Sequence, residues 1–188
     1  MVKVLGKLMV VMAMVVFALV GVTHNAYADD FECRGSIGAV TKDNIVVPNG
    51  ATCRLTGTRV QGNINVLTNA VLIADGVDVE GNIQSEGATR VRVIGNSVVD
   101  GSIQIKQGRE ALLNTVTVGS DVQIEQNRGA VRITNTNVEG NMQVKQNTGG
   151  VYIFRNTIRE NLQCEQNTPA PTGGQNAAGD KEGQCARL

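Results

Sequence analysis

The stretch GNMQVKQN, residues 140 to 147, decides the fold because it recurs along the chain. Within it only Met142 and Val144 are apolar. Related stretches are GNIQSEG from Gly81, GSIQIKQG from Gly101, SDVQIEQN from Ser120 and ENLQCEQN from Glu160. Repetition of one short unit is typical of repeat architectures, in which every copy serves the same structural purpose.

The first apolar residue of each copy marks the period of the repeat. These residues are Ile64, Ile83, Ile103, Val122, Met142 and Leu162. They are separated by steps of 19, 20, 19, 20 and 20 residues, and Ile45 continues the series 19 residues earlier. A β-branched residue precedes each of them by four positions: Val60, Val79, Val99, Val118, Val138 and Ile158.

Apolar and polar residues alternate within each repeat, as at Val131/Ile133 and Val151/Ile153, which is the periodicity of a β-strand. Strands this short cannot bury an apolar face alone, but coils stacked in register can place like residues in one internal column. The sequence therefore predicts an all-β fold: a single-domain, right-handed parallel β-helix (a β-solenoid) with about six coils of 19 or 20 residues over residues 45 to 167. A left-handed hexapeptide helix does not fit, because its period of six divides neither step.

The polar residues of the repeat are predicted to stack in rows on the outside of the rod. In one row the charge alternates from coil to coil: Glu86, Lys106, Glu125, Lys145 and Glu165. Two rows consist of glutamine: Gln84, Gln104, Gln123, Gln143 and Gln163, and Gln107, Gln126, Gln146 and Gln166. A fourth row is Asn127, Asn147 and Asn167. Side-chain amides in register can hydrogen-bond from coil to coil, so the stretch is interpreted as architecture rather than as a row of ligand sites.

The four cysteines are even in number, which in an exported chain indicates disulfides, and three pairings are possible. Their placement along the chain favours one of these pairings. Cys33–Cys53 would pin an N-terminal lead-in over residues 29 to 44, and Cys164–Cys185 would pin a Pro- and Gly-rich capping tail over residues 168 to 188. A metal site with four cysteines needs closely spaced C-x-x-C pairs, which the sequence lacks.

Residues 1 to 28 have the features of a cleavable signal peptide. Lys3 and Lys7 precede an apolar run, and Ala26-Tyr27-Ala28 is an A-x-A cleavage site. We expect an exported protein, periplasmic or secreted, without a stable membrane span after cleavage. Cleavage would also remove His24, the only histidine, and with it every catalytic or metal site that needs imidazole. The remaining 15 basic and 17 acidic residues do not favour nucleic acid as a partner.

The repeated V-x-G-N-I-Q units, the opening VPNGATCRLTGTRVQGNINV from Val47 to Val66 and the ending LQCEQNTPAPTGGQN from Leu162 to Asn176 resemble a group of exported bacterial β-helix repeat proteins. The resemblance covers nearly the whole chain after the signal segment. It implies a parallel β-helix and an exported location, but no active site. The G-N-I/V pattern is also distantly similar to bactofilins, which are polymer-forming right-handed β-helices, and to pectate-lyase-like β-helices. The signal segment and the cysteine-closed ends depart from the bactofilin pattern.

One pair of carboxylates is the best candidate for chemistry. Glu80 and Asp100 lie three residues before Ile83 and Ile103, so stacked coils would place them about 4.8 Å apart. Paired acids on an outer face can bind calcium, and polysaccharide-cleaving enzymes use carboxylates for acid–base work. Other coils have glutamine or arginine at this position, which favours solvated turn residues over a calcium site.

The aromatic residues Tyr152 and Phe154 share an alternating segment and therefore face one way. We predict that they pack near the C-terminal end of the rod. The sequence shows no catalytic residues and implies no cofactor. We expect a monomeric, non-enzymatic structural or interaction protein of the cell envelope or exterior, whose partner is unknown and could be a polysaccharide. The alternative is a carbohydrate-active β-helix that binds or cleaves a polysaccharide, with calcium at Glu80 and Asp100.

Overall fold

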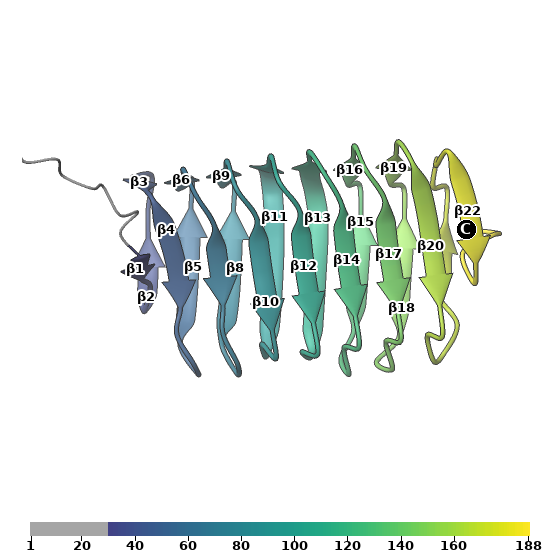
Figure 1. Cartoon of the computed structure of the whole chain (residues 1–188), viewed down its shortest axis with the longest axis horizontal. Coiled ribbons are helices and arrows are strands. Elements are labelled where there is room, and N and C mark those ends of the chain that lie inside the picture. The colour runs from purple at the N-terminus through teal and green to yellow at the C-terminus, as the bar shows by residue number, and fades with distance from the viewer. Residues whose placement is uncertain (1–29) are drawn as a thin grey trace, which may run out of the picture.

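Stacked coils form a rod in the computed structural model, which describes residues 30–188 (Figure 1). Each coil adds one strand to a nine-stranded sheet and one to a second sheet, and all strand pairs are parallel. In Figure 1 the near strands run downward and the far strands upward while the chain advances from left to right, which is a right-handed winding. There is no helix in the described part of the chain. The predicted all-β parallel β-helix is confirmed.

The strands of the nine-stranded sheet, called the first sheet, begin each coil. They are β1 (Asp30–Glu32), β4 (Asn44–Val47), β7 (Ile64–Val66), β10 (Ile83–Glu86), β12 (Ile103–Lys106), β14 (Val122–Glu125), β17 (Met142–Lys145), β20 (Asn161–Glu165) and β22 (Asp180–Gly183). The second sheet follows in each coil: β2 (Gly35–Ile37), β5 (Thr52–Thr56), β8 (Val71–Asp75), β11 (Arg90–Val99), β13 (Glu110–Val118), β15 (Val131–Thr134), β18 (Val151–Phe154) and β21 (Thr172–Gly174). Short strands complete the coils: β3 (Thr41–Lys42), β6 (Arg59–Val60), β9 (Asp78–Val79), β16 (Asn137–Val138) and β19 (Thr157–Ile158).

The rod has about eight turns, whereas the sequence predicted about six coils. The difference lies at the two ends, where the chain keeps the coil after its sequence has lost the repeat. Before the first predicted coil, Phe31 pairs with Ile45. In the Pro- and Gly-rich tail, which lies beyond the predicted coils, Thr172 pairs with Tyr152. Backbone pairing needs no particular side chain, so the end segments extend the sheets without the repeat pattern.

One internal column of apolar residues runs along the rod beneath the first sheet. It consists of Ile45, Ile64, Ile83, Ile103, Val122, Met142 and Leu162. All of them are fully buried, and each such side chain contributes about 1.5–3 kcal/mol of transfer free energy. A second internal column is formed by the residues two positions later in the same strands, and it is apolar except at Ser85. The buried hydroxyl of Ser85 has no hydrogen-bond partner among the described residues.

The coils of 20 residues gain their additional residue in two different places. In the coil that begins with β10, the additional residue forms a bulge in β11, between Ile94 and Ser97, relative to β13. In the coils of β14 and β17 the residue lies in the turn that leads to the second sheet. Gly95 in the bulge has a φ of 73°, and a Cβ atom there would collide with the side chain of Asp75. The bulge therefore needs glycine at this position.

The asparagine row lies inside the rod, which corrects the prediction of an outer row. Asn127 and Asn147 are 0% exposed. Each follows a glutamine in the left-handed region, Gln126 with a φ of 58° and Gln146 with a φ of 56°. A left-handed residue reverses the strand alternation at the corner, and the next side chain then points into the coil rather than outward. Only the glutamines remain on the surface.

The buried asparagines form a ladder of hydrogen bonds along the rod. Asn127 donates its main-chain N–H and its side-chain Nδ2 to Asn147 Oδ1, each at 3.0 Å. Asn147 in turn donates Nδ2 to the carbonyl of Ile124 at 2.9 Å. A second corner has the same arrangement, with Asn156 and Asn176. Every corner amide that these side chains satisfy would otherwise be a buried, unpaired donor.

The ladder predicts a large effect of a single truncation. Asn147→Ala removes the acceptor of the buried Asn127 N–H, and we expect a loss of about 3 kcal/mol in the free energy of unfolding. Gln143→Ala, in the same coil but on the outer surface, should change it by less than about 0.5 kcal/mol. Urea unfolding followed by circular dichroism measures both. Equal midpoints for the two variants would contradict a structural role for the ladder.

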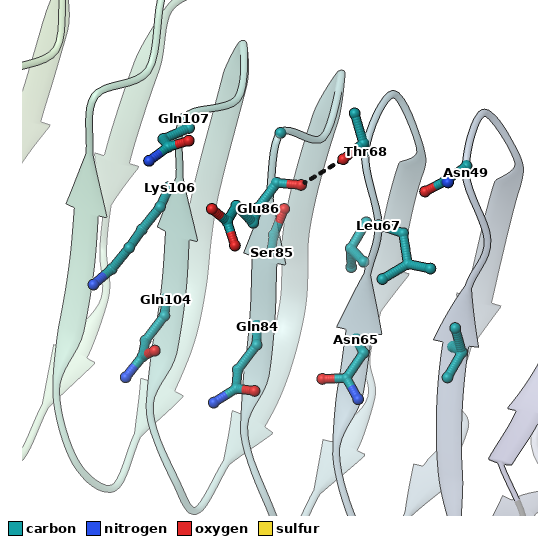
Figure 2. Close-up of a pocket in the computed structure, with 13 residues that line it drawn as sticks. Asn49, Asn65, Leu67, Thr68, Gln84, Ser85, Glu86, Gln104, Lys106 and Gln107 are labelled. Carbon is teal, nitrogen blue, oxygen red and sulfur yellow. Dashed lines mark hydrogen bonds between the residues drawn. The ribbon is translucent and has the colours of Figure 1, made fainter.

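The outer rows of the first sheet stack as predicted. Gln84 pairs with Gln104, and Glu86 with Lys106, so like positions lie side by side on neighbouring strands (Figure 2). Farther along the charge row, Lys106 Nζ lies 3.5 Å from Glu125 Oε2, and Lys145 Nζ lies 3.7 Å from a Glu165 carboxylate oxygen. The register of the charge row is confirmed, and its alternating sign avoids like charges on neighbouring strands.

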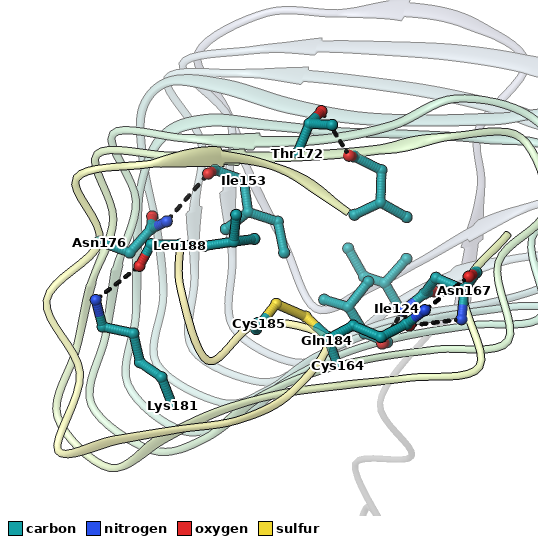
Figure 3. Close-up of a disulfide and its surroundings, with 12 residues drawn as sticks. Ile124, Ile153, Cys164, Asn167, Thr172, Asn176, Lys181, Gln184, Cys185 and Leu188 are labelled. Carbon is teal, nitrogen blue, oxygen red and sulfur yellow. Dashed lines mark hydrogen bonds between the residues drawn. A yellow bond between two sulfur atoms is a disulfide. The ribbon is translucent and has the colours of Figure 1, made fainter. Parts of the chain in front are cut away.

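The tail closes the C-terminal end of the rod. The disulfide Cys164–Cys185 is present, and Cys185 and Leu188 lie across the opening of the last coil (Figure 3). Gln184 continues the asparagine ladder: its Oε1 accepts the main-chain N–H of Asn167 at 2.8 Å, and its Nε2 donates to the Asn167 carbonyl at 2.9 Å. The cap thus satisfies the last rung of the ladder as well as covering the core.

The N-terminal end is closed differently. The predicted disulfide Cys33–Cys53 is present. Phe31 and Lys42 occupy inward positions, because they pair with Ile45 and Val60, and the Lys42 ammonium lies 4.0 Å from the Phe31 ring centroid. A charge directed inward on the terminal coil opposes stacking of another apolar end upon it. Lys42 is partly exposed there and makes a cation–π contact with the exposed ring of Phe31.

The two caps predict different outcomes when their disulfides are removed. Cys164→Val/Cys185→Ser frees the tail, and we expect concentration-dependent oligomers in light scattering because the last coil becomes an open edge. Cys33→Val/Cys53→Val should lower the melting temperature without oligomers, because Lys42 still protects that end. Long filaments of the oxidised parent protein would contradict the capping interpretation and favour a bactofilin-like polymer.

Candidate ligand-binding face

The outward face of the second sheet carries an arginine in every second coil. In register along the rod, the row consists of Arg54, Ile73, Arg92, Leu112, Arg132 and Tyr152. Neighbouring strands lie about 4.8 Å apart, so the guanidinium groups start from backbone positions about 10 Å apart. Apolar side chains occupy the steps between them. The row was not predicted, because the additional residue in the turns after β14 and β17 shifts Arg132 and Tyr152 by one position relative to the first-sheet repeat.

Aromatic rings end this row on the C-terminal side. Tyr152 and Phe154 are stacked, with ring centroids 5.8 Å apart and ring planes inclined by 27°. The guanidinium of Arg132 lies 4.6 Å from the Tyr152 centroid, and that of Arg155 lies 4.9 Å from the Phe154 centroid. Both rings lie on the outer surface and are half-buried by these contacts. The two rings therefore pack near the C-terminal end as predicted, but against surface side chains, and neither ring contributes to the core.

Four arginines of this face have no acidic partner in residues 30–188. Among residues 30–188, no carboxylate lies within ion-pair distance of Arg54, Arg92, Arg132 or Arg155. The buried Nε of Arg92 has no hydrogen-bond partner in that part of the chain. Arg155 donates Nε to Gln175 Oε1 at 2.8 Å, so Arg54, Arg92 and Arg132 are the groups best positioned to receive an anionic group from outside.

A neighbouring pair on the same face shows the contrast. Arg90 Nε lies 2.6 Å from Glu110 Oε2. This hydrogen bond is the main reason why the pKa of Glu110 is lowered and that of Arg90 is raised. The negative charge of Glu110 is thereby compensated by Arg90. Asp75 is the other acid on the outer face of these strands. The second-sheet face keeps a positive excess.

A shallow groove of about 690 Å³ runs along Arg92, Arg132 and Arg155 across four coils, and Arg54 lies outside it. The residues that carry its chemistry are Arg92, Leu112, Arg132, Tyr152, Phe154 and Arg155. They come from β11, β13, β15 and β18 and the turn after β18, so the groove runs along the rod axis. Its open shape suits a linear ligand laid along the rod better than a small molecule that must be enclosed.

A second groove, of about 730 Å³, lies on the first sheet (Figure 2). Its walls are Gln84, Gln104 and the oppositely charged Glu86 and Lys106, with Leu67 at one side. Amides and balanced charges offer no net attraction for a charged ligand, and no aromatic ring lies in this groove. We therefore regard the second-sheet groove as the candidate site, although it is slightly smaller.

The predicted calcium pair has a different partner. Glu80 and Asp100 follow the paired residues Val79 and Val99, so they lie on neighbouring coils as predicted. Arg59 donates Nη2 to Glu80 Oε1 at 2.7 Å and Nη1 to Asp78 Oδ2 at 2.6 Å. The hydrogen bond with Glu80 is the largest cause of the raised pKa of Arg59. Arg59 therefore already compensates the charges of Glu80 and Asp78, whereas Asp100 has no ion pair in residues 30–188. That part of the chain contains no group of three or more potential metal ligands.

No family model, no curated protein and no solved structure matches the chain. The two disulfides indicate an oxidising, exported environment. In residues 30–188 no helix has the length and hydrophobicity that a membrane span requires. The predicted signal peptide lies outside the described residues.

The Arg59 contacts lead to a prediction for calcium. Millimolar calcium should leave the melting temperature of the protein unchanged, because a site that binds only weakly adds no measurable stability at this concentration. Differential scanning calorimetry with calcium and with EDTA measures this. A rise with calcium that disappears in Glu80→Gln/Asp100→Asn would establish the calcium pair and favour the carbohydrate-active alternative.

Proposed function

We propose that the chain is an exported, non-enzymatic interaction protein of the cell envelope or exterior, which acts as a rigid monomeric rod. The observation that carries this proposal is the unpaired arginine and aromatic face of the second sheet, displayed on a β-solenoid whose two ends are closed by disulfides. A rod of in-register coils holds such a face at fixed spacing without any loop that must close on a ligand.

The case against catalysis rests on the residues that the groove brings together. Arg92 and Arg132 remain charged at all ordinary pH values and cannot act as general acid or base. The outer face of these strands carries two carboxylates: Glu110 is held ionised by Arg90, and Asp75 lies beside Gly95, which lines the groove. Tyr152 is the remaining titratable side chain at the groove, and it is covered by Arg132. These groups suit binding and not bond cleavage.

The carbohydrate-active alternative differs in requiring turnover. Its supporting observation is the stacking of Glu80 on Asp100, on the side of the rod formed by the short strands. A binding protein leaves its polysaccharide intact, whereas a lyase or hydrolase releases shorter products.

The test uses the full chain expressed in a bacterial host. We expect a mature protein that begins at Asp29, is found outside the cytoplasm and has no free thiol. The purified protein should sediment with isolated cell envelopes and release no products from a polysaccharide panel, with or without calcium. Cytoplasmic retention, failure to sediment with envelopes or product release would each contradict the proposed function.

A further inference from the structure

We propose that the second-sheet groove binds an extended anionic polysaccharide laid along the rod axis. This inference rests on the proposed interaction role and identifies the class of partner. The groove begins at Arg92, and the row of outward side chains continues beyond it to Arg54 on β5. From Arg54 to Tyr152 on β18 the row covers six coils and about 24 Å of rod. A ligand that uses the whole row must be linear.

The spacing of the arginines identifies a repeated negative charge. Arg54, Arg92 and Arg132 recur in every second coil, about 10 Å apart at the backbone, and none has an acidic partner in residues 30–188. Planar guanidinium groups bind carboxylate and sulfate oxygens in a bidentate manner. An extended chain with one acidic group for every two rings would meet one arginine after another.

The steps between the arginines identify the rest of the ligand. Leu112 is the apolar step inside the groove, and Ile73 is the apolar step between Arg92 and Arg54 beyond it. The stacked rings of Tyr152 and Phe154 lie at the C-terminal end of the groove. Sugar rings present C–H faces that pack on apolar and aromatic side chains. A cation–π contact with Arg132 and another with Arg155 hold the two rings in place before the ligand arrives, which lowers the entropic cost of binding.

Other polyanions fit the face less well. The chain after the signal segment has more acidic than basic residues, and Asp78, Glu80 and Asp100 line the adjacent side of the rod, so there is no broad positive field for nucleic acid. An acidic peptide would add as a strand, but the groove lies on a sheet face, where the backbone groups are already paired along the rod.

Isothermal titration calorimetry tests this with defined probes in EDTA: polygalacturonate, dextran sulfate, uncharged dextran, polyglutamate and polyphosphate. We expect both acidic glycans to bind, dextran not to bind, and polyglutamate and polyphosphate to bind at least about tenfold more weakly because they lack sugar rings. The affinity for the acidic glycans should fall as salt rises.

Two double variants change the net charge by the same amount on different faces. Arg92→Gln/Arg132→Gln should weaken glycan binding by about tenfold or more, whereas Gln104→Glu/Gln143→Glu, on the first sheet, should weaken it by less than about twofold. Tyr152→Ala/Phe154→Ala tests the aromatic end, with a loss of about fivefold expected. Melting curves establish that each variant is folded.

Three results would overturn the inference. Equal binding of polyglutamate or polyphosphate would show attraction to charge alone. Equal losses in the two charge variants would show that the second-sheet groove is not the site. Absence of binding to either acidic glycan would exclude the proposed ligand class, and the proposed function would still stand if the same protein sediments with envelopes.

Discussion

The buried hydrogen bond between corner asparagines of successive coils is the interaction on which the rest of the structure depends. A β-solenoid turns within a few residues, and each tight corner leaves main-chain amides inside that no strand can satisfy. Asn147 Oδ1 accepts the main-chain N–H of Asn127 in the preceding coil, and Asn167 Oδ1 accepts that of Asn147. Because the bond joins equivalent positions, it enforces the register that stacks the apolar columns.

Register also determines the surface of the rod. When the isoleucine and valine columns align inside, the residues between them must align outside, which gives the charge row of the first sheet and the arginine row of the second. The charge row balances itself from coil to coil. The arginine row does not, since Ile73 and Leu112 occupy the intermediate positions. The charges of the first sheet therefore compensate one another, whereas the arginines of the second sheet remain able to bind an anion.

The two ends of the rod stop the repeat in different ways. At the C-terminal end Gln184 takes the place of the next asparagine, and Cys185 holds the tail across the core. At the N-terminal end an inward lysine lies on Phe31. Gln184 thus continues the buried hydrogen-bond ladder at the C-terminal end, whereas Lys42 interrupts the apolar column at the N-terminal end with a charge. Both suit a rod that works as a single unit.

The sequence by itself determined the period, the apolar columns, the parallel β-helix and both disulfides, because these depend on spacing and on the number and position of the cysteines. Only the tertiary structure decided where the twentieth residue of a coil goes, at a bulge beside Gly95 or at a turn. It also decided that Asn147 lies inside, since a left-handed residue at the corner reverses the alternation on which sequence reasoning relies. The arginine row and the Arg59 contact with Glu80 join residues about one or two coils apart, and such neighbours follow from the register of the folded rod and not from their order in the chain.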